Sequence, residues 1–312
     1  QGYIDAACQA ARMEDTIIAT YGDMLRVPGR EGSLEELRCE GAEVFVVYSA
    51  RDALLKALNE PGKRVVFLAV GFETTAPATA ATILEAEKRG AENFYALMGH
   101  KLIMPAMQTL LSDEEVDIDG FILPGHVSVI IGSRAYDPIS RVFAKPGVIT
   151  GFEGGQLLLG LQSLLKLIEQ GRPLIENVYG VAVREEGNRV AQRMLADVFE
   201  EGDANWRALG RIDNSALKLR EEYKGFDAAG SLGLVEGPDY EPPGCICGAV
   251  IQGKSKPREC PHFASSCTPL EPIGPCMVSS EGTCAAWYKY GAASVESSSG
   301  TRKTSQNREN RS

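Results

Sequence analysis

Six of the eight cysteines in this 312-residue chain lie within forty residues near its end. Thiols packed so densely bind a metal ion, bind an iron–sulfur cluster or pair as disulfides. Their spacing is C-x-C-x12-C-x6-C-x8-C-x7-C, and the members are Cys245, Cys247, Cys260, Cys267, Cys276 and Cys284. One tetrahedral metal ion or one cubane cluster takes four thiolates. The count therefore predicts four ligands plus a pair that is free for redox chemistry.

Composition excludes several classes of protein. The net charge is −10 and the pI is about 5.0, which argues against nucleic-acid binding because that usually needs a basic face. The sequence has no apolar run of about 18 residues and no secretory signal pattern, so we expect no membrane span. A cytoplasmic location follows as the default. Thiols stay reduced there, which favours a metal-binding or catalytic cysteine cluster over structural disulfides.

The first half alternates short β-branched apolar runs with amphipathic stretches, which is typical of an α/β fold with parallel sheets. We expect two doubly wound, Rossmann-like α/β lobes that divide near Gly120, followed by a small Cys-rich domain in which a metal centre replaces the core. The predicted strands are 16–20, 44–48, 65–70, 94–98, 121–123 and 148–150, and the predicted helices are 50–59, 76–89, 102–111 and 156–170.

The predicted domains are 1–118, 119–230 and 231–292, with a tail at 293–312. Charged residues over 186–225 predict helices, with residues 190–200 forming one of them. The tail is polar and basic from residue 297 onward and lacks apolar residues, so we expect it to be disordered.

Three motifs follow predicted strands directly, where α/β proteins bind ligands. GFETTAP begins at Gly71, LPGHVS contains His126, and GFE ends at Glu153. Each also has a simpler interpretation. The first is then a turn capped by Thr74 or Thr75, His126 is a satisfied polar residue, and Glu153 caps a helix.

A further loop, TYGDMLRVPG, follows the first predicted strand. Its Asp23 and Arg26 either contact a partner or form a surface ion pair with each other, and the ion pair is the simpler interpretation.

Together with these motifs, the segment CICGAVIQGKSKPRECPHFASSCTPLEPIGPCMVSSEGTC resembles the HypD family of hydrogenase maturation factors. The resemblance runs from about residue 1 to residue 290. It implies a scaffold for the Fe(CN)2CO unit of nickel–iron hydrogenases, held only transiently, rather than a metabolic enzyme. It also implies a HypC-like chaperone and a HypE-like cyanide donor as partners. The fold implied is two α/β lobes and a domain with a 4Fe–4S cluster beside a redox thiol pair, similar to ferredoxin:thioredoxin reductase.

The family's ligand spacing, C-x14-C-x6-C-x16-C, assigns the 4Fe–4S cluster to Cys245, Cys260, Cys267 and Cys284. Cys247 and Cys276 are then left as the redox pair. Without the resemblance, zinc remains open, either as two structural sites that share ligands or as one site with spare thiols.

Two further residues are assigned chemical roles. We expect His126 and Glu281 to lie nearest the redox pair, where either could relay protons and His126 could hydrogen-bond a cyanide ligand. In the alternative interpretation Glu281 caps a helix and His126 fills a core position.

Family members also carry C-G-T-H-T and G-P-G-C-P-V-C motifs before the point that corresponds to Gln1. The chain as given is therefore expected to lack the main iron-binding thiol, which neither Cys8 nor Cys39 replaces. Two other functions stay open from the sequence, an iron–sulfur thiol–disulfide reductase that acts on a protein and a zinc-stabilised binding module.

Overall fold

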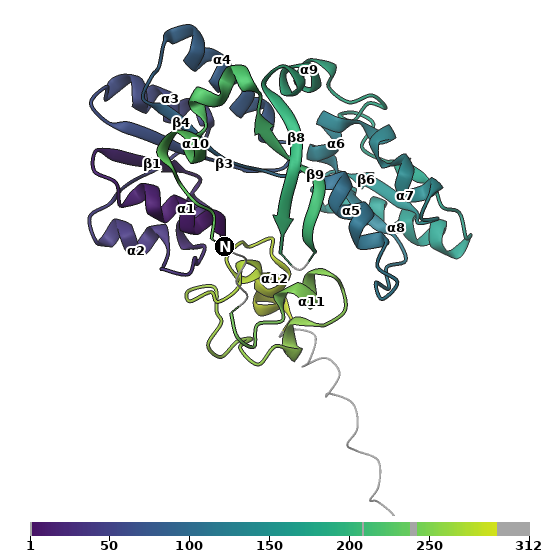
Figure 1. Ribbon diagram of the computed structural model, residues 1–312. Helices are drawn as coiled ribbons and strands as arrows, with labels where there is room; N and C mark the ends of the chain where they lie inside the picture. Colours follow the sequence, from purple (N-terminus) through teal and green to yellow (C-terminus); the bar gives the residue numbers. More distant parts are fainter. Residues whose placement is uncertain (1, 208, 238–241, 292–312) are drawn as a thin grey trace, which may run out of the picture.

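The computed structural model describes residues 2–207, 209–237 and 242–291. Two α/β lobes lie side by side, and the Cys-rich segment (residues 242–291) lies beneath them (Figure 1). The predicted tail falls outside the described residues. Among those residues, every helix is too short or too polar to cross a bilayer.

The first lobe is built on a four-stranded parallel sheet with the order β2-β1-β3-β4. Its strands match the predicted runs and are β1 (Thr16–Thr20), β2 (Glu43–Val46), β3 (Arg64–Gly71) and β4 (Phe94–His100). After β1 the chain moves to one side of the sheet, and after β2 it returns to the other. The turns after β1 and β3 therefore flank the switch point, where open α/β sheets bind ligands.

Helices cover both faces of this sheet: α1 (Gly2–Ala11), α2 (Leu34–Cys39), α3 (Ala50–Asn59) and α4 (Ala76–Arg89). Alternate residues of β3 point to opposite faces, so Phe67 packs in the core under α3 and α4 while Leu68 packs under α1 and α2. Ser49 starts α3 with a capping box, in which Asp52 is the partner. The predicted α/β fold with a parallel sheet is confirmed for this lobe.

The second lobe has a three-stranded parallel sheet with the order β5-β6-β7. Its strands are β5 (Phe121–Pro124), β6 (Gly147–Thr150) and β7 (Ile175–Asn177), and its helices are α5 (Ile103–Leu111), α6 (Gly125–Ile131), α7 (Asp137–Arg141) and α8 (Gly154–Glu169). Ile149 of β6 packs in one core cluster with Tyr136, and Val148 packs on the other face against Leu164 of α8.

The prediction of helices over 186–225 is wrong for most of that range. Among the described residues of this range, only α9 (Arg189–Val198) is a regular α-helix, and the chain then forms an antiparallel hairpin of β8 (Phe199–Trp206) and β9 (Gly210–Leu219). A 3-10 turn and α10 (Ala228–Leu232) follow. Phe199 and Leu219 of the hairpin join the core of the first lobe. The division of the chain at residues 118 and 230 stays a prediction.

The Cys-rich segment has little regular structure, as predicted. It holds α11 (Cys247–Ile251), α12 (Thr283–Tyr290) and two 3-10 turns, Pro257–Glu259 and Pro275–Met277. Its apolar core is small, and its buried members are Val250, Cys267, Met277, Cys284 and Ala285. Since two of these five side chains are cysteines, the thiols themselves supply much of the packing.

Candidate functional site

All six clustered cysteines line one small, apolar cavity. Two of them stand on helices, with Cys247 opening α11 and Cys284 near the start of α12, and Cys276 lies in a 3-10 turn. The other three lie in loops. The remaining lining residues are Ile246, Val250, His262, Phe263, Gly274 and Met277. The structure thus brings together the thiols that the sequence placed in one cluster.

The sulfur atoms are close together. Sγ of Cys247 lies 2.9 Å from Sγ of Cys276, which in turn lies 3.1 Å from Sγ of Cys284. The backbone N–H of Ile273 donates to Sγ of Cys267 at 3.3 Å. All eight cysteines, each within the described ranges, are free thiols. Distance alone therefore leaves Cys276 with two possible partners.

Contact between the thiols and burial favour the protonated forms of Cys245, Cys247 and Cys276. Hydrogen bonding with Cys247, followed by burial, raises the pKa of Cys245 well above its usual range. For Cys276, the hydrogen bond from Cys247 lowers the pKa, but the bond to Cys284 and burial outweigh it and raise the pKa to about 12. A bound metal centre reverses this balance, since a coordinating thiol is deprotonated outright.

The donor set fits an iron–sulfur cluster in its chemistry. Six thiols surround an apolar cavity, and a cubane needs four. The cavity volume is about 10 Å³, which is about one water molecule, so the sulfurs must move apart to admit a cluster. Among the described residues, no three Cys, His, Asp or Glu side chains are arranged to hold a single metal ion.

His262 lines the same cavity, although the sequence gave it no role. Its Nε2 lies 2.9 Å from the carbonyl oxygen of Pro243 and so donates to it, which leaves Nδ1 to accept from the Ser266 hydroxyl at 2.8 Å. Both ring nitrogens are thus engaged. His262 therefore fastens the loop that carries Cys245 to the loop after Cys260. Its position two residues after Cys260 was the only signal in the sequence.

His126 and Glu281 lie elsewhere, since the described residues around the cysteine cavity include neither. His126 is exposed in the first turn of α6, and its ring lies 4.8 Å from that of Phe152. The alternative prediction that His126 fills a core position is therefore wrong. Glu281 is also exposed, and Gly282 rather than Glu281 occupies the N-cap of α12. The alternative prediction that Glu281 caps a helix is wrong as well.

The two second-lobe motifs do meet at the carboxyl edge of their sheet. Pro124 of β5 pairs with Thr150 of β6, so the turn that carries His126 lies beside the turn that carries Phe152. Glu153 is the N-cap residue of α8 by position, but its side chain makes no capping hydrogen bond among the described residues. The edge thus presents an imidazole, a phenyl ring and a carboxylate together.

The first-lobe motif GFETTAP forms a tight turn after β3. Gly71 has φ +111°, and a Cβ there would lie 2.3 Å from the Thr75 hydroxyl oxygen. Thr75 is the N-cap residue of α4, but its hydroxyl donates to the carbonyl of Val70 at 3.0 Å. The prediction that a threonine side chain caps this helix is therefore wrong, because the hydroxyl closes the turn instead.

Glu73 is a buried residue of this turn that sequence reasoning missed. Its Oε1 accepts the backbone N–H of Ile103 at 3.0 Å, which ties the turn to the start of α5. Its Oε2 is buried and has no hydrogen-bond partner within the part of the chain that the structure describes. Burial raises the pKa of this carboxyl, and the two backbone hydrogen bonds offset the rise only in part.

Arg26 does not pair with Asp23. It donates instead to the carbonyl oxygen of Pro269 at 3.0 Å, so the loop after β1 is fastened to the Cys-rich segment. Asp23, Arg26 and Glu281 line a shared cavity of about 840 Å³. Met277 lines both this cavity and the cysteine cavity, so one buried side chain separates them.

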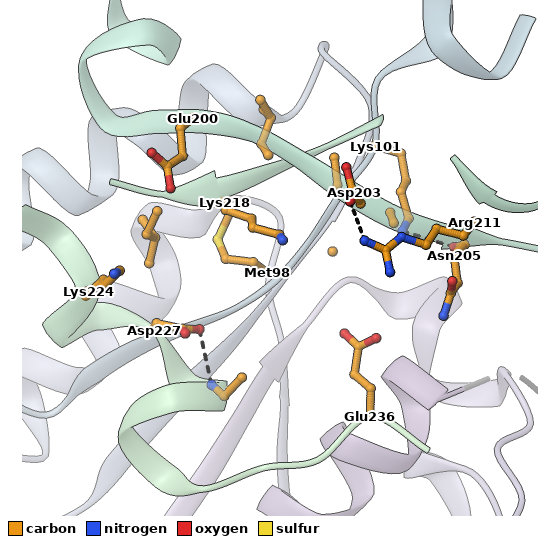
Figure 2. A pocket seen from close by; sticks show the side chains of 16 residues that line it. Met98, Lys101, Glu200, Asp203, Asn205, Arg211, Lys218, Lys224, Asp227 and Glu236 are labelled. Carbon is orange, nitrogen blue, oxygen red and sulfur yellow. Dashed lines mark hydrogen bonds and ion pairs between the residues drawn. The ribbon is translucent and has the colours of Figure 1, made fainter. Parts of the chain in front are cut away.

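Another cavity, of about 620 Å³, lies between the β8–β9 hairpin, β4 and α10 (Figure 2). Figure 2 shows Lys218 and Met98 near its middle and Arg211 paired with Asp203. Asp227 accepts from the backbone of Ala229. The lining is strongly charged and holds both signs, and it contains none of the clustered cysteines.

Comparison with known proteins agrees with the resemblance. A family model described as HypD, the hydrogenase formation hypA family, matches residues 1–291. The hydrogenase maturation factor HypD of Rhodobacter capsulatus is 43% identical over 299 residues, which cover 93% of this chain and 78% of that protein. The HypD proteins of Azotobacter vinelandii and Escherichia coli are 44% and 42% identical, with the same coverage of each chain. This chain therefore belongs to the HypD family of hydrogenase maturation factors.

Proposed function

We propose that this protein, together with a HypC-like chaperone, is the cytoplasmic scaffold on which the Fe(CN)2CO unit is assembled. The cyanide groups come from a HypE-like donor, and the iron unit is cargo rather than a resident cofactor. A resident 4Fe–4S cluster is held by Cys245, Cys260, Cys267 and Cys284. Cys247 and Cys276 form the redox pair.

The observation that carries the proposal is the 2.9 Å separation of the Cys247 and Cys276 sulfurs inside a cavity lined by all six thiols. These two cysteines are the pair that remains once the family's ligand spacing is applied. Cys245 and Cys247 are one residue apart, so one sulfur can ligate while the other faces its redox partner. The shorter of the two contacts that Cys276 makes is the one to Cys247.

The chemistry proposed for the pair is thiol–disulfide exchange. Oxidation joins the two Sγ atoms and releases two protons and two electrons, and reduction reverses each of these changes. When bound, the cluster supplies electrons one at a time. The residues of the chain hold the sulfurs in contact and exclude water, since the cavity is apolar and Cys247 is buried.

His126 and Glu281 are proposed to move protons or to hydrogen-bond the cargo. Both side chains are exposed and free to meet a partner-bound group. His126 stands at the strand edge of the second lobe, and Glu281 lines the cavity next to the cysteine site. This proposal does not include contact with the redox pair, because neither His126 nor Glu281 is among the described residues that line the cysteine cavity.

Anaerobic purification tests the proposal directly. We expect visible charge-transfer absorbance, with iron and acid-labile sulfide in equal amounts, and co-purification with a HypC-like partner. Zinc without iron would instead support the binding-module reading. Iron and sulfide without any HypC-like partner would leave the thiol–disulfide reductase as the better description.

A further inference from the structure

The β8–β9 hairpin extends from the first lobe and its tip reaches the Cys-rich segment (Figure 1). Trp206 ends β8, and Arg207 follows it at the tip. Nη2 of Arg207 lies 3.9 Å from Sγ of Cys245, across 38 residues of sequence. The guanidinium at the hairpin tip therefore lies beside the sulfur of a cysteine in the Cys-rich segment.

The guanidinium is incompletely satisfied in this position. Its Nε is buried and has no hydrogen-bond partner among the residues that the structure describes. A buried donor without a partner is unfavourable, and a neutral thiol is only a weak acceptor. The arrangement becomes favourable once the neighbouring sulfur carries negative charge, as a metal-bound thiolate does.

We propose that Arg207 is the charge partner of the cysteine centre, a positioning residue whose guanidinium stabilises negative charge on the sulfur of Cys245 and on the group bound there. This inference rests on the proposed cysteine centre. A fixed positive charge favours the more negative, reduced form of a bound cluster. Removal of Arg207 therefore lowers the reduction potential.

The hairpin holds Arg207 in place through contacts away from the cysteines. Nε1 of Trp206 donates to the Ser215 hydroxyl at 2.8 Å, and Lys101 lies 5.9 Å from the Trp206 ring. Phe72, from the turn after β3, lies 6.0 Å from the same ring. A continuous set of contacts therefore runs from the GFETTAP turn through Trp206 to Arg207. The guanidinium is positioned before any group binds.

The first test uses the cluster-free protein and two alkylating reagents that differ in charge. Both reagents react with the thiolate of Cys245, but only iodoacetate is negatively charged. The ratio of the iodoacetate rate to the iodoacetamide rate is therefore independent of the thiolate fraction and reports the electrostatic potential at the sulfur. We expect Arg207→Gln to lower this ratio by about threefold, as a unit charge about 5 Å away in water implies. Arg207→Lys keeps the charge and should keep most of the ratio. Exposed Cys39 is the internal reference.

Arg211→Gln is the matched control, because it removes a cation from the same hairpin that pairs with Asp203 rather than with a cysteine. Its ratio at Cys245 should equal that of the wild type. If Arg207→Gln does not fold, the salt dependence of the wild-type protein provides the test. Added salt screens the charge of Arg207, so it should lower the ratio at Cys245 more than at Cys39. An unchanged ratio in Arg207→Gln, or equal salt responses at both cysteines, overturns the proposal.

The second test uses the loaded protein. The midpoint potential of the bound cluster, followed by spectroscopic redox titration, should fall in Arg207→Gln and recover in Arg207→Lys. Equal potentials in the wild type and both variants also overturn the proposal. If the wild type binds no cluster, the proposed function fails, while the alkylation ratio still decides whether Arg207 acts on Cys245.

Discussion

Sγ of Cys247 and Sγ of Cys276 lie 2.9 Å apart, although 29 residues separate them in the sequence. The contact is made between the first turn of α11 and the 3-10 turn Pro275–Met277. A disulfide needs the sulfurs about 2.05 Å apart, so only a small movement separates the two thiols from a bond. Cys276 also lies 3.1 Å from Cys284, which makes the identity of its oxidised partner a question for experiment.

The first prediction is that mild oxidation of the cluster-loaded protein links Cys247 to Cys276. With Cys284 engaged as a ligand, Cys247 is the neighbour left to react. Mass spectrometry after alkylation under non-reducing conditions should find this peptide pair. Cys276→Ser should abolish it, while Cys8→Ser, at a buried site in α1, should leave it intact. A bond from Cys276 to Cys284 would contradict the assignment of ligands and redox pair.

The second prediction concerns the ligands. Cys260→Ala should remove most of the bound iron, because four thiolates are needed and Cys260 is one of the four proposed. The Cys-rich segment should then become more sensitive to proteolysis, since its own apolar core is small. Iron analysis and limited proteolysis measure the two effects. Cys39→Ala, at an exposed thiol outside the cluster, is the control. Wild-type iron content in Cys260→Ala would exclude it as a ligand.

The strands β1, β3 and β6 were predictable because they are buried on both faces, whereas the short and largely uncovered β7 was not predicted. β3 is a run of β-branched and apolar residues, and its five residues 65–69 are fully buried. The β8–β9 hairpin lacks such a signal. β8 reads FEEGDANW, in which only Phe199 and Gly202 are buried, and a bulge between Gly202 and Ala204 breaks the alternation further. Its packing on the first lobe, which no local pattern encodes, stabilises it as a hairpin.

The same contrast holds for the site. The cysteine cluster was visible because its members are adjacent in sequence and chemically distinctive. Arg207 and Glu73 gave no signal, since each acquires its role from a segment far away. Arg207 reaches Cys245 across the hairpin tip, and Glu73 reaches the backbone of Ile103. His126 was expected near the cysteines because it follows a strand, and the carboxyl ends of parallel strands gather at one edge of a sheet. That edge belongs to the sheet of the second lobe, where the turn of His126 lies beside the turn after β6.

The third prediction is a pH dependence from His100. Burial lowers its pKa to about 4, and a hydrogen bond with Gly71 offsets this only in part. The unfolded chain takes up a proton at about pH 6.5, whereas the folded protein does so only near pH 4. The free energy of unfolding should therefore fall as the pH drops from 6.5 to 4, by up to about 3 kcal/mol from this group.

Denaturant titrations at several pH values measure this slope. Glu73 works in the opposite direction, because its raised pKa adds stability as the pH falls. The informative quantity is therefore the difference between wild type and His100→Asn, whose curve should be flatter over this range. An equal slope in His100→Asn would show that His100 does not remain neutral in the folded protein.

The fourth prediction concerns the turn after β3. Gly71→Ala should destabilise the protein by about 1–3 kcal/mol, because the new Cβ adds a clash with Thr75 to an unfavourable backbone conformation. Gly41→Ala is a close control, since Gly41 has φ +107° but open space around its Cβ position. Gly41→Ala should cost about 1 kcal/mol from the backbone alone. Chemical denaturation measures both, and equal costs would mean that the clash is relieved without loss.

The fifth prediction separates ring stacking from proton chemistry at His126. Because the side chain is exposed and its ring lies against that of Phe152, His126→Ala should change the free energy of unfolding by no more than about 0.5 kcal/mol. It should nevertheless reduce hydrogenase activity in a host whose maturation depends on a full-length version of this protein that also carries the C-G-T-H-T and G-P-G-C-P-V-C motifs. His126→Phe keeps the aromatic contact and removes both ring nitrogens, so it should fail as His126→Ala does. Full maturation with His126→Phe would show that the ring acts only by packing against Phe152, and the proposed proton or cyanide contact would be wrong.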